Sequence, residues 1–136
     1  MKNKPSTILM LLWMLLIFTM SSFDATESAN QSNFIVNIIT NIFKIENIEV
    51  LSFIIRKLAH FTEYLILGVL VINMFTKNNL SKTYLLSIIL CVIYATSDEI
   101  HQLFIPGRVC QIKDILIDSV GSITGIYLYK LLIKRK

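Results

Sequence analysis

The stretch STILMLLWMLLIFTMSSF, residues 6–23, contains no charged residue and decides the class of fold. A helix needs about 20 mostly apolar residues to cross a bilayer. Further long apolar runs lie at about residues 58–76, 83–104 and 112–133, each with ionisable residues toward one end. The sequence therefore predicts an all-α integral membrane protein, a four-helix bundle whose helices span the bilayer.

Composition supports a membrane protein of a single domain, residues 1–136. Of the 136 residues, 54% are apolar and only 16% are charged, whereas soluble domains carry about 25% charged residues. The mean hydropathy is +0.66. Such apolar content excludes disorder, and two cysteines are too few for a disulfide scaffold. The net charge of +4 comes without a basic patch interleaved with aromatic residues, so we expect no nucleic-acid partner.

The first apolar run has two interpretations. Lys2 and Lys4 before it, and Ser21 and Ser22 at its end, resemble the parts of a signal peptide. No A-x-A-like cleavage site follows, which favours a retained membrane anchor over a cleaved signal.

The basic residues predict the orientation, because Lys and Arg stay preferentially on the cytoplasmic side. With both termini cytoplasmic, one group of basic residues falls inside: Lys2, Lys4, Lys77, Lys82, Lys130, Lys134, Arg135 and Lys136. A smaller group falls outside: Lys44, Arg56, Lys57, Arg108 and Lys113. We therefore expect a multi-pass protein of the cell membrane with both ends in the cytoplasm.

Residues 24–56 form a long outer loop in this topology. Its polar beginning, residues 24–33, is expected to be flexible. Apolar residues then recur at helical spacing, with asparagines opposite: Phe34, Ile38, Ile42 and Ile45. This pattern predicts an amphipathic helix in the membrane interface, and a helix that caps the bundle from outside is the alternative.

Polar side chains collect toward the outer ends of the last three runs. Ionisable residues inside a span are costly and usually functional. Helical spacing places the members on facing helix sides: Arg56, His60, Glu63, Tyr64, Asp98, Glu99, His101, Gln102, Asp114 and Asp118. Arg108 follows a Pro-Gly turn that lets it fold back toward them. The sequence thus predicts a binding site, called here the outer polar cluster.

The individual roles stay open at this level. His60 suits a general base, a metal ligand or a hydrogen-bonded packing residue. Arg108 suits a phosphate or carboxylate ligand, or an anchor to lipid headgroups. A hard divalent cation is possible through five carboxylates: Glu63, Asp98, Glu99, Asp114 and Asp118. No other cofactor is expected. In the last run, Gly121 and Gly125 have a GxxxG spacing that predicts close helix packing.

Residues 56–68, RKLAHFTEYLILG, resemble the RKxAHFxEYxxLG stretch of VanZ-like membrane proteins. Residues 97–108, SDEIHQLFIPGR, resemble the second motif of that family, SDExHQxFxPGR. In the last run, Asp114 and Asp118, followed by Gly121 and Gly125, resemble the third motif of the family. Positions that match the motifs are His60, Glu63, Asp98, Glu99, Gln102, Arg108 and Asp114.

The resemblance implies a bacterial cell-envelope protein associated with reduced susceptibility to the glycopeptide teicoplanin. It implies no catalytic residue. The sequence also lacks HExxH, CxxC pairs, a Walker lysine loop and GxSxG, which favours a protein that is not an enzyme.

These observations favour a non-catalytic protein that binds membrane lipid, or a lipid-linked cell-wall precursor, at the outer leaflet. The alternative is an enzyme acting on an isoprenoid or phospholipid headgroup, with the residues His60, Asp98, Glu99, Arg108 and Asp114. A proton-coupled transporter ranks lower, because no polar path continues to the cytoplasmic side. A purely structural cluster that locks the helices together is the remaining interpretation.

Overall fold

The computed structural model describes residues 3–43, 47–79 and 83–134, and this part of the chain consists of helices and their connections. The helices are α1 (Lys4–Ser21), α2 (Ala25–Phe43), α3 (Ile48–Lys77), α4 (Thr83–Gln102) and α5 (Ile112–Lys134). All but α2 are long and apolar enough to cross a membrane. The predicted all-α fold with four spans is therefore confirmed.

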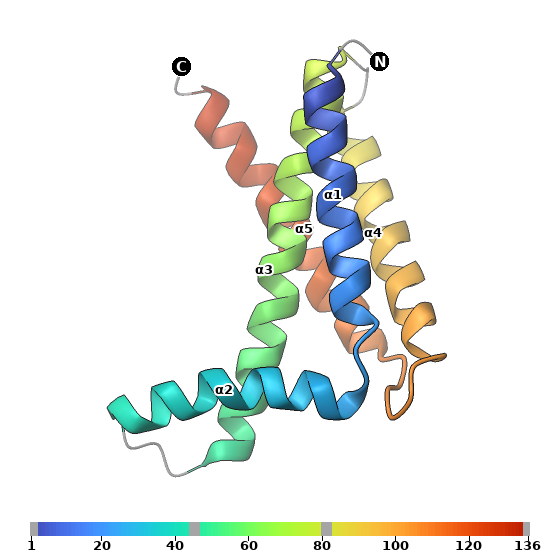
Figure 1. Ribbon diagram of the computed structural model, residues 1–136. Coiled ribbons are helices and arrows are strands. Elements are labelled where there is room, and N and C mark those ends of the chain that lie inside the picture. Colours follow the sequence, from blue (N-terminus) through green and yellow to red (C-terminus); the bar gives the residue numbers. More distant parts are fainter. Residues whose placement is uncertain (1–2, 44–46, 80–82, 135–136) are drawn as a thin grey trace.

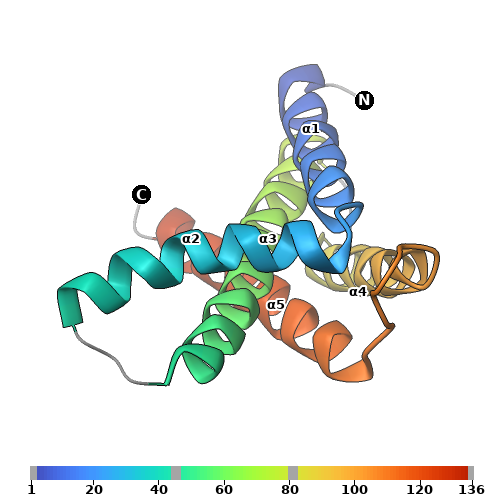
Figure 2. The ribbon, with the colours of Figure 1, turned by 60° about the horizontal axis from the view of Figure 1, so that its bottom comes forward.

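The four long helices run side by side, and α2 lies across the lower part of the bundle, in front of the first part of α3 (Figure 1). Both ends of the chain lie at the opposite end of the bundle from α2. In the view from below, α2 crosses in front of α3 (Figure 2), and α3 contacts each of the other helices. The helix α3 is therefore the centre of the bundle, and the end that α2 covers is called here the α2 end.

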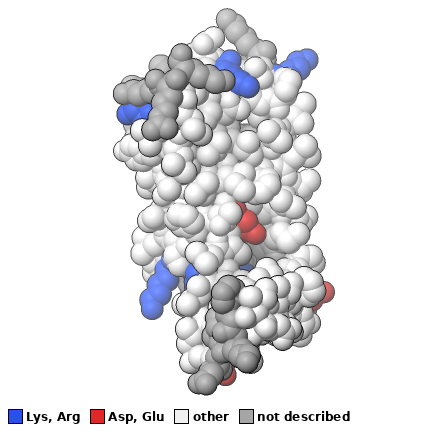
Figure 3. All heavy atoms as spheres, turned by 90° about the vertical axis from the view of Figure 1, so that its left-hand side faces the viewer, with Lys and Arg blue, Asp and Glu red and all other residues white. Residues whose placement is uncertain are grey.

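The outside of the bundle is apolar. Large apolar side chains stand exposed along every long helix, for example Leu12 at 58%, Ile93 at 60% and Leu132 at 66%. The space-filling view in Figure 3 shows Lys and Arg at the two ends and a band almost free of charge between them. Such an exterior suits lipid, because hydrocarbon offers no partners for charged groups.

Short polar side chains fix where the helices begin. Asn3 accepts the backbone N–H of Ser6 at 3.2 Å, and Asn47 accepts that of Val50 at 3.2 Å. Asp24 accepts the N–H of Glu27 at 2.8 Å at the start of α2. These are N-caps, which satisfy the free N–H groups of a first turn.

The predicted outer loop, residues 24–56, is largely helical in the structure, because α2 and the first turns of α3 lie within it. Residues 25–33 form the first half of α2, so the prediction that this part would be flexible was wrong. The helix α3 begins at Ile48, and not near Leu58, because the Asn47 cap extends it toward the N-terminus. What remains between α2 and α3 is a short connection.

The helix α2 presents two different faces. Ser32 and Val36 are buried against the bundle, with exposed fractions of 7% and 0%. Phe34, Ile38 and Ile42 stay exposed on another side. The helix therefore packs on the bundle with one face and leaves an apolar face uncovered by the described chain.

Some residues that carry the topology and loop predictions lie outside the described part: Lys2, Lys44, Ile45, Lys82, Arg135 and Lys136.

Glycines bring α3 and α5 into backbone contact. A Cβ added at Gly121 would lie 2.5 Å from the carbonyl oxygen of Phe61, and one at Gly125 would lie 2.0 Å from that of Leu65. From the other side, a Cβ at Gly68 would lie 2.2 Å from the carbonyl oxygen of Ser122. Small residues permit such close approach in membranes. This contact sets how far the side chains of α3 lie from those of α5.

Candidate functional site

Polar side chains of α4 and α5 are buried in the half of the bundle nearest α2. The most deeply buried are Glu99 and Asp118, both 0% exposed. Gln102, Asp98 and Asp114 are 2%, 4% and 6% exposed. Helical spacing on α4 and α5 turns these residues inward, since positions 98 and 102 and positions 114 and 118 are four apart.

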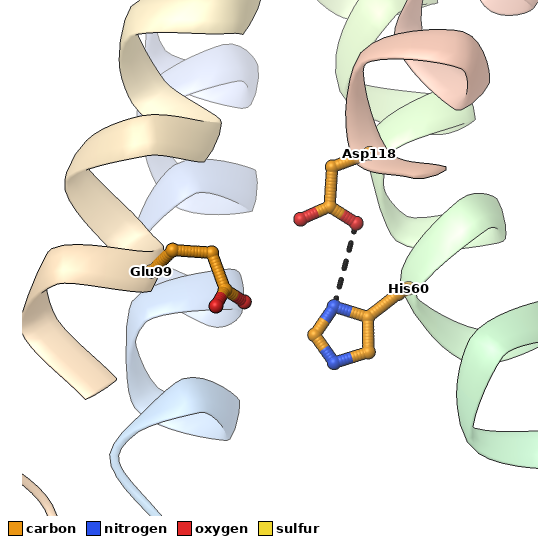
Figure 4. Close-up of side chains that lie close together, drawn as sticks. All are labelled: His60, Glu99 and Asp118. Atoms are coloured by element: carbon orange, nitrogen blue, oxygen red, sulfur yellow. Dashed lines mark ion pairs between the residues drawn. The ribbon is translucent and has the colours of Figure 1, made fainter. Parts of the chain in front are cut away.

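His60 on α3, Glu99 on α4 and Asp118 on α5 converge on one point. His60 Nδ1 lies 3.4 Å from Asp118 Oδ1. One ligand atom from each of the three side chains lies within 4.8 Å of the other two. Figure 4 shows the Glu99 carboxylate directed from α4 toward the His60–Asp118 pair. These three residues are called here the His-Glu-Asp triad.

The connection after α4 orients Glu99. The backbone N–H of Gln111 donates to Glu99 Oε2 at 2.8 Å. The other carboxylate oxygen, Oε1, is buried and has no hydrogen-bond partner in the described chain. The loop thus holds the carboxylate in place through one oxygen and leaves the other without a partner in the described chain.

Lys57 and Asp114 form a second ion pair beside the triad. Their side chains are 18% and 9% exposed, so the pair is largely withdrawn from solvent. We did not include Lys57 in the outer polar cluster. A signal for it exists in the sequence, because Lys57 precedes His60 by three residues and so shares its helix face.

Two pockets open beside His60 at the α2 end. The first, of about 130 Å³, lies between α1, α2 and α3 and reaches Glu63 and Asp98. The second, of about 150 Å³, lies between α3 and the connection 103–111 and reaches Gln102 and Asp114. Both are large enough for several water molecules. Water and small headgroups can therefore reach His60, the member of the triad that lines both pockets, from this end.

Arg56 and Arg108 line both pockets. The ion pairs within the described residues are Lys57–Asp114 and His60–Asp118, so neither arginine pairs with a described carboxylate. Unpaired guanidinium groups suit phosphate or carboxylate ligands. The two arginines give the pockets the character of an anion site at their rim.

A turn at Gly107 places Arg108 at this rim. Gly107 has a φ of +72°, which side-chain-bearing residues rarely adopt. A Cβ there would also lie 2.9 Å from the Cβ of Ala25, and Ala25 donates its N–H to the carbonyl of Pro106 at 3.3 Å. The turn is therefore fastened to the start of α2, and Arg108 faces back into the pockets.

The structure separates some predicted members of the outer polar cluster from the triad. His101 lies against α1, where its ring stacks on Phe18 at 4.5 Å between centroids and its Nε2 lies 3.2 Å from Ser22 Oγ. Tyr64 is fully buried in the apolar core, 6.2 Å from the ring of Tyr94. These two side chains connect helices and do not line either pocket.

Ser21 near the end of α1 is a pocket residue that sequence reasoning missed. It is 7% exposed, and it lines the first pocket together with Asp98. A serine at the end of an apolar run carries no distinctive signal, because the pocket that it shares with Asp98 is formed by helices distant in the sequence.

Several buried polar atoms have no hydrogen-bond partner among the described residues: Ser21 Oγ, Tyr64 OH, Asp98 Oδ1, Glu99 Oε1, Gln102 Nε2 and both Asp118 carboxylate oxygens. Buried polar groups are normally paired, and a cluster of unpaired ones calls for an explanation. Two ligand types fit the geometry: a cation at the triad and an anion at the arginines.

Comparison with protein families matches the VanZ/LLP1 family over residues 6–133. Comparison with curated proteins found no match, and comparison with solved structures found none either. The family match extends over all four membrane-spanning helices and over every member of the outer polar cluster. The chain therefore belongs to the VanZ/LLP1 family.

Proposed function

We propose that this protein is a cell-envelope protein that binds the anionic headgroup of a membrane lipid or a lipid-linked cell-wall precursor. The binding lowers susceptibility to teicoplanin. The observation that carries the proposal is the pair of arginines, Arg56 and Arg108, which line both pockets without a described carboxylate partner.

The surroundings of the pockets fit a lipid. The exposed apolar face of α2, with Phe34, Ile38 and Ile42, lies at the same end of the bundle as the arginines. An amphipathic helix at that depth rests in the interface between headgroups and acyl chains. A lipid headgroup in the pockets would leave its chains beside this helix.

The excess of basic residues at the end of the bundle opposite α2 supports an outward orientation of the pockets. Bound lipid precursor would then lie on the side from which glycopeptides approach. We propose that occupancy of the pockets changes how much of this precursor a glycopeptide can reach.

Teicoplanin susceptibility of bacteria expressing the chain tests this function. We expect the wild type to lower susceptibility, Arg108→Ala to abolish the effect, and Lys113→Ala to retain it. Lys113 is exposed at the start of α5 and lines neither pocket, so it controls for loss of a positive charge. Membrane abundance is measured in the same cells. No effect of the wild type, or full effect of Arg108→Ala at equal abundance, would contradict the proposal.

The His60–Asp118 pair beside the arginines favours a second candidate function, hydrolysis of a lipid phosphoester. In that reaction water attacks phosphorus and gives a proton to His60. The bond to the lipid oxygen breaks, and His60 passes this proton to the leaving oxygen. Purified protein incubated with an isoprenoid monophosphate or with phosphatidic acid tests it. Phosphate release that His60→Gln abolishes would establish this candidate, and absence of release from the wild type would remove it.

A further inference from the structure

We infer that His60, Glu99 and Asp118 form a binding site for a divalent transition-metal ion of the Mn²⁺ or Zn²⁺ type. Each of three helices contributes one residue, and the nearest ligand atoms lie within 4.8 Å of one another. The site does not depend on the proposed lipid binding, because it involves neither arginine.

The spacing of the ligand atoms is close to that of a metal centre. Metal–ligand bonds of about 2.0–2.2 Å place the ligand atoms about 3–4 Å apart. His60 Nδ1 and Asp118 Oδ1 already lie 3.4 Å apart. Side-chain rotations that move the third ligand atom by about 1 Å complete the arrangement.

Three of the four carboxylate oxygens of Glu99 and Asp118 lack a hydrogen-bond partner among the described residues. Glu99 and Asp118 are both 0% exposed. Glu99 Oε1 and both oxygens of Asp118 are without hydrogen-bond partners among the described residues. Figure 4 shows the two carboxylates directed toward the same space. Buried charges are either paired or bound to metals, because isolated ones are costly.

The charges around the triad are unbalanced. Lys57 forms an ion pair with Asp114. Among the described residues, the remaining ion pair joins His60 to Asp118, so His60 is the one basic partner of the deeper carboxylates. Asp98, Glu99 and Asp118 are all at least nine-tenths buried. A divalent cation between Glu99 and Asp118 would supply the missing positive charge.

The hydrogen bond to Glu99 is of the kind that supports metal ligands. The Gln111 N–H fixes the carboxylate through Oε2, and Oε1 is buried without a hydrogen-bond partner among the described residues. Outer hydrogen bonds of this type orient ligating carboxylates and strengthen metal affinity.

The ligand set points to the class of ion. One imidazole and two carboxylates suit Mn²⁺, Fe²⁺ or Zn²⁺, whereas sites for Ca²⁺ and Mg²⁺ rely on oxygen ligands. The pockets beside His60 give water and ions access from the α2 end. The carboxylates Glu63, Asp98 and Asp114, which the sequence also nominated for a cation, lie outside the triad.

Metal binding to the full-length protein in detergent tests the site. The protein is treated with a chelator, desalted and titrated with MnCl₂ or ZnCl₂. The bound metal is then measured by inductively coupled plasma mass spectrometry. We expect one ion per chain and a higher thermal unfolding midpoint with metal. Glu99→Gln and Asp118→Asn should each weaken binding by about 100-fold or more, since even outer-shell changes cost about 10–100-fold.

Glu49→Gln is the matched control, because it makes the same chemical change to an exposed carboxylate at the start of α3, outside the triad and both pockets. It should bind metal like the wild type. Asp118→Asn stands in if Glu99→Gln fails to insert, and both variants are checked by gel filtration. The inference is overturned if the wild type binds neither metal stoichiometrically, or if both triad variants bind as well as Glu49→Gln does.

Discussion

At the scale of single residues, the contact between α3 and α5 depends on the absence of side chains. Gly121 and Gly125 of α5 lie against backbone carbonyls of α3, and Gly68 of α3 lies against Ser122. The same contact brings Asp118, one turn before Gly121, to 3.4 Å from His60. Packing and the polar site therefore depend on the same stretch of α5.

Gly125→Ala should destabilise the bundle by about 1–3 kcal/mol, because its Cβ would lie 2.0 Å from the carbonyl oxygen of Leu65 and the helices would have to separate. Unfolding by dodecyl sulfate in mixed micelles measures this. Thr124→Ala, the neighbouring position on the outer side of α5, is the control and should unfold like the wild type. Equal stability of the two variants would contradict the close packing.

The Lys57–Asp114 ion pair predicts energetic coupling between α3 and α5. Lys57→Gln and Asp114→Asn should each destabilise the protein, because each leaves the other side chain without its partner. The double variant should lose less than the sum, with a coupling free energy of about 0.5–3 kcal/mol. Additive losses in the same unfolding assay would show that the pair does not form.

At the scale of helices, the boundaries show what the sequence can predict. The four spans follow from long runs with few charges, because length and hydropathy alone decide whether a helix can cross a bilayer. The start of α3 was missed because a single asparagine cap at position 47 decides it. The first half of α2 was missed because polar residues suit a loop as well as an interfacial helix.

The outer polar cluster was predictable as a set and less so in its pairings. Helical spacing brought residues from three helices to one depth. Helical spacing did not predict that Gln102 faces the second pocket whereas His101 faces α1. The directions of neighbouring side chains around a helix differ by less than a third of a turn. It also could not tell which carboxylate meets His60, because that depends on the approach of α5 to α3.

The two faces of α2 predict opposite effects of two similar substitutions. Val36→Ala should destabilise the protein by about 1–2 kcal/mol, because Val36 is 0% exposed against the bundle. Ile38→Ala should leave the free energy of unfolding in detergent unchanged, because Ile38 is 48% exposed. Similar losses from both would mean that α2 packs in a different register.

At the scale of the whole molecule, the arrangement combines an apolar exterior with polar groups at one end of the interior. Both ends of the chain lie opposite α2, and the connection 103–111 lies at the α2 end (Figure 1). The excess of basic residues near the termini predicts that the termini are cytoplasmic and the pockets face outward.

Cysteine labelling of intact cells checks this orientation. Cys110 lies in the connection 103–111 and is partly exposed, whereas Cys91 is buried. A membrane-impermeant maleimide should label Cys110 without permeabilisation. Asn79→Cys in a Cys110→Ser background, between α3 and α4, should react only after permeabilisation. The reverse pattern would place the pockets in the cytoplasm.

The binding of anionic lipid to the purified protein tests the central claim most directly. Native mass spectrometry compares phosphatidylglycerol, an isoprenoid diphosphate and neutral phosphatidylcholine on the wild type and two double variants. Arg56→Gln with Arg108→Gln removes the two pocket cations that have no described carboxylate partner, and Lys77→Gln with Lys130→Gln removes cations at the other end. We predict that at least one anionic lipid binds in preference to phosphatidylcholine, that the arginine variant loses the preference and that the lysine variant keeps it. No preference in the wild type, or an unchanged preference in the arginine variant, would contradict the account.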